Sequence, residues 1–234
     1  MLKYCLLSWP LLVLLMPEAL AQIPFPREEN RWEISMFAGV SGLGDKTLVT
    51  PVEGGTIRDV GLNFDSGYLL GFRIGENLTP RFGAELEYAL ANQPLLFVNL
   101  SPSIPLLELS HKVHKFAYSV LVYPMRRQGR YIPFLSIGMG ASYFRISSDS
   151  IDDALLQGVD LKNRWKFAFT YGGGVKFPMG PEWGLRVDVR DHVTGVSDYG
   201  FPSTAPPLGA GLRPNGVLHS WQVSGALLYT FGDR

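Results

Sequence analysis

The chain has 234 residues, and its 21 basic side chains are balanced by 21 acidic ones, which gives no reason to expect nucleic acid as a partner. A single cysteine excludes a disulfide framework and a cysteine-rich metal site. Glycine is abundant, at 26 residues, and aromatic residues make up 12% of the chain, a mixture that suits many short strands joined by turns.

The first residues have the pattern of an export signal. A lysine precedes an apolar stretch at residues 6–16, and Ala19 and Ala21 then match the small-x-small pattern of a cleavage site. The apolar stretch is too short to cross a bilayer as a helix, which needs about 20 residues. We therefore expect residues 1–21 to be a cleaved signal peptide and residues 22–234 to form one domain.

Eight later segments alternate between large apolar residues and small or polar residues with period two, which is the pattern of β-strands. In chain order the expected strands are residues 32–40, 65–74, 82–90, 115–123, 131–143, 165–177, 183–190 and 220–231. None of them has the periodicity of an amphipathic helix. The sequence therefore predicts an all-β fold.

The connections between these strands alternate in length. The short ones are residues 76–81, 124–130 and 178–182, and the long ones are residues 41–63, 91–113, 147–164 and 192–217. Short periplasmic turns alternating with long extracellular loops, over an even number of strands, are typical of outer-membrane barrels. This alternation predicts an eight-stranded antiparallel up-and-down transmembrane β-barrel with both termini at the short turns.

The sizes of the side chains predict which face of each strand points outward. One face is rich in Gly, Ala and Ser, and an eight-stranded barrel has an interior just wide enough for side chains. The other face carries most of the large apolar residues, so it is expected to face lipid. Aromatic residues gather at both ends of this face, as in the girdles of membrane barrels: Phe82, Tyr131, Phe177, Trp183, Tyr229 and Phe231 near the short turns, and Tyr68, Tyr88, Phe116, Tyr143, Trp165 and Trp221 near the long loops.

The last segment, residues 224–231, ends in the aromatic-x-aromatic pattern Tyr229-Thr230-Phe231. With the export signal and the eight alternating segments, it resembles the small OmpA-type and OmpW-type outer-membrane barrels over the whole mature chain. The resemblance implies a bacterial outer-membrane location, insertion by the barrel-assembly machinery, and outer-membrane lipid and lipopolysaccharide as surroundings. No peptidoglycan-binding domain follows the barrel, so anchoring to the cell wall by such a domain is not implied.

The face expected to point inward carries both signs of charge in nearly equal number: Glu33, Asp65, Glu85, Glu87 and Asp188 against Arg73, Lys115, Lys166, Lys176, Arg186 and Arg190. A pore that selects ions of one sign would favour one charge. Buried charges must instead be paired, so we expect a salt-bridged network in the lumen formed by Arg73, Glu85, Glu87, Arg186, Asp188 and Arg190. A narrow, gated conduit lined by these charges is the alternative.

No catalytic, metal or cofactor site is predicted. Glu85 and Glu87 would lie inside the barrel without access to substrate, although a carboxylate pair can serve as acid and base. Some eight-stranded barrels are lipid A deacylases with a histidine on the lipid-facing side, but His192 falls in the inward phase. His192 and the remaining histidines, His111, His114 and His219, lack metal-ligand spacing and are expected to be solvated loop residues.

Three of the expected loops contain apolar or proline-rich stretches, at residues 94–109, 151–161 and 201–214. Such loops should fold over the barrel mouth, pack on each other or bind a partner that the sequence does not identify. We therefore expect a non-enzymatic outer-membrane barrel with a structural or surface-interaction role through its loops. An OmpW-like conduit for small hydrophobic molecules is the first alternative, and a lipid A-modifying enzyme is the second.

Overall fold

The computed structural model describes residues 31–43, 46–49, 59–64, 66–92, 95–100, 103–109, 111–147, 162–195 and 217–232. The expected signal peptide, Asp65, and the stretches at residues 151–161 and 201–214 lie outside these residues. Among the residues described, no helix is long and apolar enough to cross a membrane.

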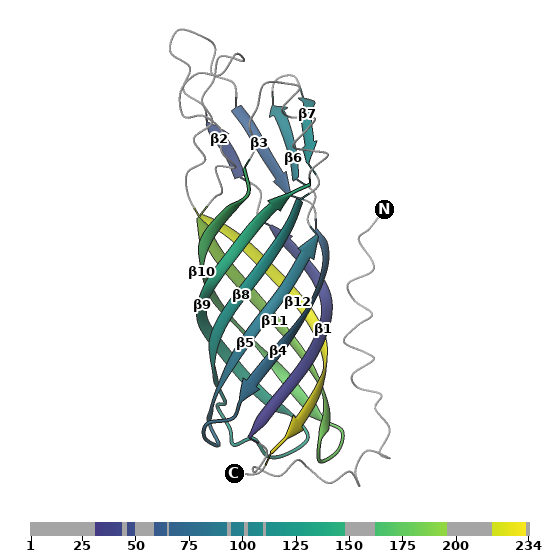
Figure 1. Ribbon diagram of the computed structural model, residues 1–234, viewed down its shortest axis with the longest axis vertical. Coiled ribbons are helices and arrows are strands. Elements are labelled where there is room, and N and C mark those ends of the chain that lie inside the picture. The colour runs from purple at the N-terminus through teal and green to yellow at the C-terminus, as the bar shows by residue number, and fades with distance from the viewer. Residues whose placement is uncertain are drawn as a thin grey trace.

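Eight antiparallel strands close into a barrel, which confirms the predicted fold class (Figure 1). They are β1 (Trp32–Leu43), β4 (Gly67–Glu76), β5 (Phe82–Asn92), β8 (His111–Val122), β9 (Ile132–Ile146), β10 (Arg164–Pro178), β11 (Trp183–Gly195) and β12 (Val217–Phe231). Each strand pairs with its neighbour in the chain order of these eight, and β1 pairs with β12 to close the cylinder.

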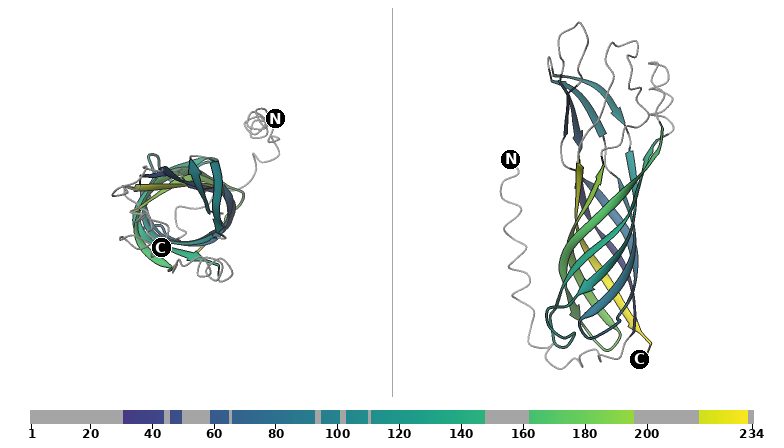
Figure 2. Two further views of the ribbon diagram at one scale, coloured as in Figure 1. Left: turned by 90° about the horizontal axis from the view of Figure 1, so that it is seen from above. Right: turned by 90° about the vertical axis from the view of Figure 1, so that its left-hand side faces the viewer.

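The two ends of the barrel differ in their connections. Residues 77–81, 123–131 and 179–182 make tight links at one end, called here the short-turn end. The Arg31 amide donates a hydrogen bond of 2.8 Å to the Gly232 carbonyl, so both ends of the described chain also lie there (Figure 2). All connections at the opposite end, called the long-connection end, are long, as the sequence predicted.

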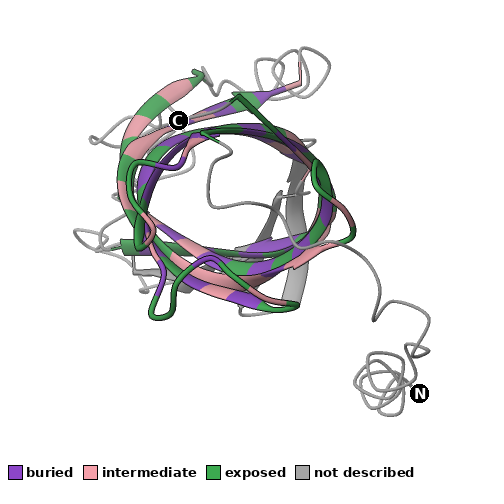
Figure 3. Cartoon of the chain, turned by 90° about the horizontal axis from the view of Figure 1, so that it is seen from below, coloured by how far each residue is buried: buried purple, intermediate pink, exposed green. Residues whose placement is uncertain are grey.

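Burial alternates along the barrel strands, as Figure 3 shows from below. On the outside, Met36 is 73% exposed and Phe167 is 67% exposed, whereas the inward Arg73 is 1% exposed. Large apolar residues therefore cover the outer wall, as predicted from side-chain size. Phe134 and Phe144 depart from this pattern, because both are buried inside the barrel, where they fill space that small residues would leave empty.

A second sheet stands beyond the long-connection end, where the sequence predicted loops. It contains β2 (Lys46–Val49), β3 (Asp59–Phe64), β6 (Leu95–Leu100) and β7 (Ser103–Leu109) in the order β2-β3-β6-β7. The first two long connections thus fold as hairpins, and β3 pairs with β6 to join them (Figure 1). The expectation of plain loops was wrong because apolar stretches such as Leu95–Leu100 satisfy their backbone groups by pairing with each other.

Candidate functional site

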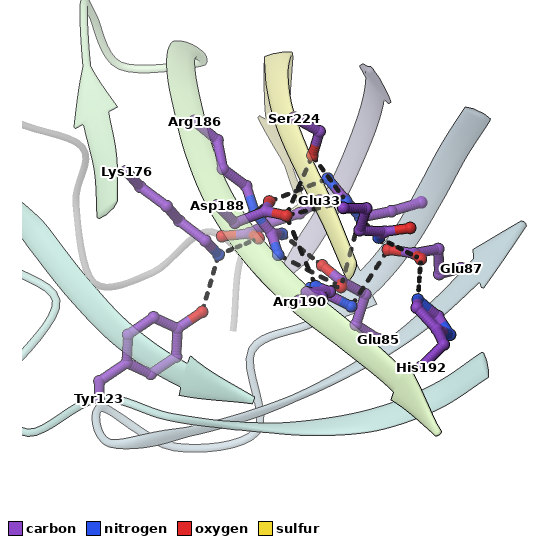
Figure 4. Close-up of polar contacts among 12 residues, drawn as sticks. Glu33, Glu85, Glu87, Tyr123, Lys176, Arg186, Asp188, Arg190, His192 and Ser224 are labelled. Atoms are coloured by element: carbon purple, nitrogen blue, oxygen red, sulfur yellow. Dashed lines mark hydrogen bonds and ion pairs between the residues drawn. The ribbon is translucent and has the colours of Figure 1, made fainter. Parts of the chain in front are cut away.

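The six charged residues predicted to form a network are brought together inside the barrel. Figure 4 shows Glu85, Glu87, Arg186, Asp188 and Arg190 pointing toward one another. Arg73 comes from β4, Glu85 and Glu87 from β5, and Arg186, Asp188 and Arg190 from β11. Strands β5 and β11 lie on opposite walls, since three strands separate them in either direction around the barrel. Every one of the six side chains is 3% exposed or less, so the group crosses a lumen that it largely fills.

Each carboxylate of this group, called the central cluster, contacts guanidinium groups from more than one residue. The Glu85 carboxylate lies 2.5 Å from Nη1 of Arg186 and 2.5 Å from Nη2 of Arg190. The Glu87 carboxylate lies 2.5 Å from Nε of Arg73 and 3.1 Å from Nη1 of Arg190. Three positive charges therefore face the negative charges without an excess of either sign.

Asp188 completes the central cluster. Its Oδ2 atom lies 2.8 Å from Nε of Arg186 and 3.1 Å from Nη1 of Arg73, and the Ser224 hydroxyl donates to its Oδ1 atom at 3.0 Å. The Gln222 amide similarly donates to Glu87 at 3.1 Å. These neutral donors on β12 compensate part of the hydration that the carboxylates lose in the lumen.

Two phenylalanine rings support the guanidinium groups of the central cluster. The Arg73 guanidinium carbon lies 3.7 Å from the ring centre of Phe37, and that of Arg186 lies 4.4 Å from the ring centre of Phe134. Stacking on an aromatic face stabilises a desolvated guanidinium and fixes its orientation. The sequence analysis did not assign Phe134 to the lumen, because large apolar residues were expected on the outer face.

A second polar group lies between the central cluster and the short-turn end. Lys176 forms an ion pair with Glu33 and donates to the Tyr123 hydroxyl at 2.7 Å, while the Asn77 amide donates to Glu33 at 3.1 Å. A cavity of about 30 Å³ lies against Glu33, Lys176 and Arg127. This volume suits one or two ordered waters and is far below the usual size of a small-molecule site.

The upper lumen, toward the long-connection end, is also polar. Lys115 donates to the Ser41 hydroxyl at 3.0 Å and to the Ser220 hydroxyl at 2.7 Å. His192 is fully buried, with Nε2 3.5 Å from the Glu87 carboxylate. Its assignment as a solvated loop histidine was wrong, because β11 continues to Gly195 and carries residue 192 inward.

One row of residues across β8, β9, β10 and β11 leaves buried polar atoms without hydrogen-bond partners. The sheet register places Ser119 beside Gly138, Gly138 beside Thr170, and Thr170 beside His192. Within the described residues, the hydroxyls of Ser119 and Thr170 are buried and form no hydrogen bond. Buried polar groups normally have a partner, so we expect ordered water to bind these two hydroxyls.

A polar group on the outer face was missed by the sequence analysis. Asp191 on β11 accepts a hydrogen bond of 2.9 Å from the Tyr171 hydroxyl, and its Oδ2 atom lies 2.6 Å from Nδ1 of His219. Their three strands are adjacent, but the residues are far apart in the chain. An Asp–His pair can orient a base, yet nucleophilic catalysis also requires a nucleophile beside the imidazole, and the hydrogen bond described for His219 is to Asp191 alone.

Across the part of the chain that the structure describes, no group of three or more His, Cys, Asp or Glu side chains is placed to hold a metal ion. The charged side chains of the central cluster are instead arranged as mutual ion pairs and hydrogen bonds.

Comparison with known proteins supports the architecture. Residues 12–213 match the family of the outer membrane protein β-barrel domain. Among solved structures, OprG from Pseudomonas aeruginosa aligns with a TM-score of 0.61 at 16% identity, covering 87% of this chain and 97% of OprG. Neisserial surface protein A aligns with a TM-score of 0.53 at 11% identity over 86% of this chain and 97% of that protein.

The outer membrane protein AlkL, determined in lipid bilayers, aligns with a TM-score of 0.51 at 18% identity over 89% of this chain and 92% of AlkL. At such identities the likeness concerns the fold alone. Comparison with curated protein sequences gives no match.

Proposed function

This chain belongs to the outer-membrane β-barrel family, and from that premise we propose that it is a closed membrane anchor with a structural or surface-interaction role at its long-connection end. The proposal rests chiefly on the central cluster, in which Arg186 and Arg190 of β11 hold the Glu85 carboxylate of β5 on the opposite wall of the lumen. A channel for one ion sign would present an excess of one charge, whereas this cluster is balanced and buried.

The orientation follows the general behaviour of the family's fold, with short turns in the periplasm and long connections outside. The sheet of β2, β3, β6 and β7 would then project from the cell surface. In this sheet β2 and β7 are the outermost strands of the order, and sheet edges present backbone groups to which an extended partner can bind.

The proposal includes no enzymatic activity. Glu85 and Glu87 are engaged by arginines inside the lumen. On the outer face, the hydrogen bond described for the His219 imidazole is to the Asp191 carboxylate and not to a nucleophile. If the protein modified lipid A, lipid A isolated from cells that contain the protein would differ in acylation from lipid A isolated from cells that lack it.

A conduit is the second candidate, and one observation favours it. The unpartnered hydroxyls of Ser119 and Thr170 lie on the wall that carries no cluster residue, so a file of water could pass there. Steady conductance of the purified protein would favour this candidate over the closed anchor.

Site-specific photo-crosslinking on intact cells tests the surface-interaction role. A crosslinking residue replaces Ser103 in β7, and the matched control carries the same residue at Gln128 in the exposed turn between β8 and β9. We expect crosslinked adducts at position 103 only, and when cysteine instead replaces each of the two residues, we expect a membrane-impermeant thiol reagent to label position 103 only. Labelling at position 128 would reverse the topology, and the absence of adducts at position 103 in a correctly inserted protein would contradict surface interaction.

A further inference from the structure

The type of outward-facing side chain on β8 and β9 differs from row to row toward the long-connection end. The sheet register places Lys112 of β8 directly beside Arg145 of β9, and both side chains are exposed. On the other side of Lys112 lies Asn92 of β5, and Asn163 borders Arg145, where its Oδ1 atom accepts a hydrogen bond of 2.9 Å from the Ile146 amide. This uppermost row therefore contains two cations flanked by amides and no acid.

The two cations are opposed without a compensating charge. Residues directly across an antiparallel pair have Cα atoms about 4.5–5.5 Å apart, and like charges in that position destabilise the pair. Within the described residues, neither Lys112 nor Arg145 has an ion pair or a hydrogen bond from its side chain. An anion bound between them would remove the repulsion.

An aromatic platform lies directly below this cationic pair. The next outward row contains His114, Tyr143 and Trp165, with ring centres 5.9 Å apart for His114 and Tyr143 and 4.8 Å apart for Tyr143 and Trp165. Phe116 extends the platform, with its ring centre 5.8 Å from that of Trp165. The Tyr88 hydroxyl fixes the imidazole of His114 at 2.9 Å. Below the charged row, this wall therefore carries a continuous group of aromatic rings.

The neighbouring part of the outer wall, on β10 to β12, lacks this combination. There the Asp191 carboxylate lies 2.6 Å from His219 and accepts a hydrogen bond from Tyr171. The basic side chain of this part of the wall, His219, thus already contacts a carboxylate. The unpaired positive charge of the outer rim, as far as the described residues show, is concentrated on β8 and β9.

We propose that Lys112 and Arg145 bind the phosphate of an anionic lipid in the outer leaflet, with the apolar part of that lipid resting on the platform of Tyr143, Trp165 and Phe116. Guanidinium and ammonium groups donate charge-assisted hydrogen bonds to phosphate oxygens, and basic positions next to a membrane surface recognise anionic head groups. The stacked order of charge and aromatic rings matches the order of phosphate, sugar and acyl chain in a phosphorylated glycolipid. The inference rests on the proposed orientation, in which the long-connection end meets the outer leaflet.

Native mass spectrometry of the full chain in detergent tests this site with two probes, diphosphoryl lipid A and the same lipid after removal of its phosphates. The variant Lys112→Gln with Arg145→Gln removes the cationic pair. Its matched control, Arg126→Gln with Arg130→Gln, removes two exposed arginines from the short-turn end. We expect the first double variant to bind the diphosphoryl lipid about 30-fold more weakly, the factor for two basic groups near an anionic lipid surface, and the control to bind it like the wild type.

Three results would overturn the proposal: equal binding by the wild type and the Lys112→Gln, Arg145→Gln variant, equal binding of the phosphorylated and dephosphorylated lipids, or binding of inorganic phosphate with the same affinity as the lipid. Trp165 provides a second readout, because its emission should shift on addition of the phosphorylated lipid to the wild type but not to the variant. Failure here would leave the proposed function intact, since closure is tested by conductance and the surface role by crosslinking at residue 103.

Discussion

The two faces of β11 show how one strand is built for two surroundings. Arg186, Asp188 and Arg190 point into the lumen and are 1% exposed, whereas Val187 and Val189 between them are 50% and 53% exposed on the outer wall. The inner side chains are stable only as a group, because each buried charge depends on its partners. The outer side chains are independent of one another, because lipid solvates each of them separately. Substitutions inside should therefore couple strongly, and substitutions outside should add.

The largest effect is expected from Glu85→Ala. The change leaves Arg186 and Arg190 without the carboxylate that lies 2.5 Å from each, and an uncompensated buried charge costs about 3–5 kcal/mol. Equilibrium urea unfolding in lipid vesicles measures the loss of unfolding free energy. The double variant Glu85→Ala with Arg186→Ala should lose less than the sum of the two single variants. Simple additivity would contradict the description of the lumen as a coupled group.

The outer face should behave in the opposite way. Replacing Leu86 or Val187 by arginine should cost about 2–4 kcal/mol, the range for a charge near the bilayer midplane. The two costs should add within about 0.5 kcal/mol, because Leu86 lies on β5 and Val187 on the opposite wall. Ser136→Ala, an inward change that removes an unpartnered hydroxyl, serves as the control and should cost little. Wild-type stability of the arginine variants would show that the faces are assigned wrongly.

Two tyrosines, one on each face, provide a finer comparison. Tyr123→Phe removes the hydroxyl that accepts a hydrogen bond of 2.7 Å from Lys176, which should cost about 1.5 kcal/mol for a bond to a charged group. Tyr118→Phe makes the same chemical change on the outer wall, where Tyr118 is 55% exposed. We expect almost no change in unfolding free energy for Tyr118→Phe. Equal effects of the two substitutions would indicate that the lumen hydrogen bond is not formed.

The smallest effect is a stabilisation. In vesicles of neutral lipid, Lys112→Gln should raise the unfolding free energy by about 0.2–1 kcal/mol, because it removes a like-charge contact with Arg145. Lys112→Arg keeps the charge and should leave the stability unchanged. A loss of stability in Lys112→Gln would mean that the cation already has a favourable partner in the protein.

The strands and their faces could be predicted because a period of two assigns every residue of a strand to one side. That parity was sufficient to select Arg73, Glu85, Glu87 and Arg186 as lumen residues. The alternation does not give the depth of a residue along the barrel axis, however. That depth depends on the stagger between neighbouring strands, which decides which residues meet across the lumen. For this reason the sequence indicated the members of the central cluster but not the contact of Arg190 with both glutamates.

Other features depend on pairings between distant segments. The Asp191–His219 contact joins two strands across a long connection, and no local pattern connects the two residues. The sheet that includes β3 and β6 was missed for the same reason, since its central pairing joins two separate connections. His192 is different, because its inward parity was visible in the sequence and should have outweighed its position near the expected strand end.

Single-channel recording in planar bilayers tests most directly the claim that the central cluster closes the barrel. We predict no steady conductance for the wild type and measurable conductance for the variant Glu85→Ala with Arg186→Ala, which removes one ion pair spanning the lumen from β5 to β11. Surface labelling at position 103 should verify that both proteins are inserted in the same orientation. Steady conductance of the wild type, unchanged in the variant, would contradict closure by the cluster and favour a conduit along the wall of Ser119 and Thr170.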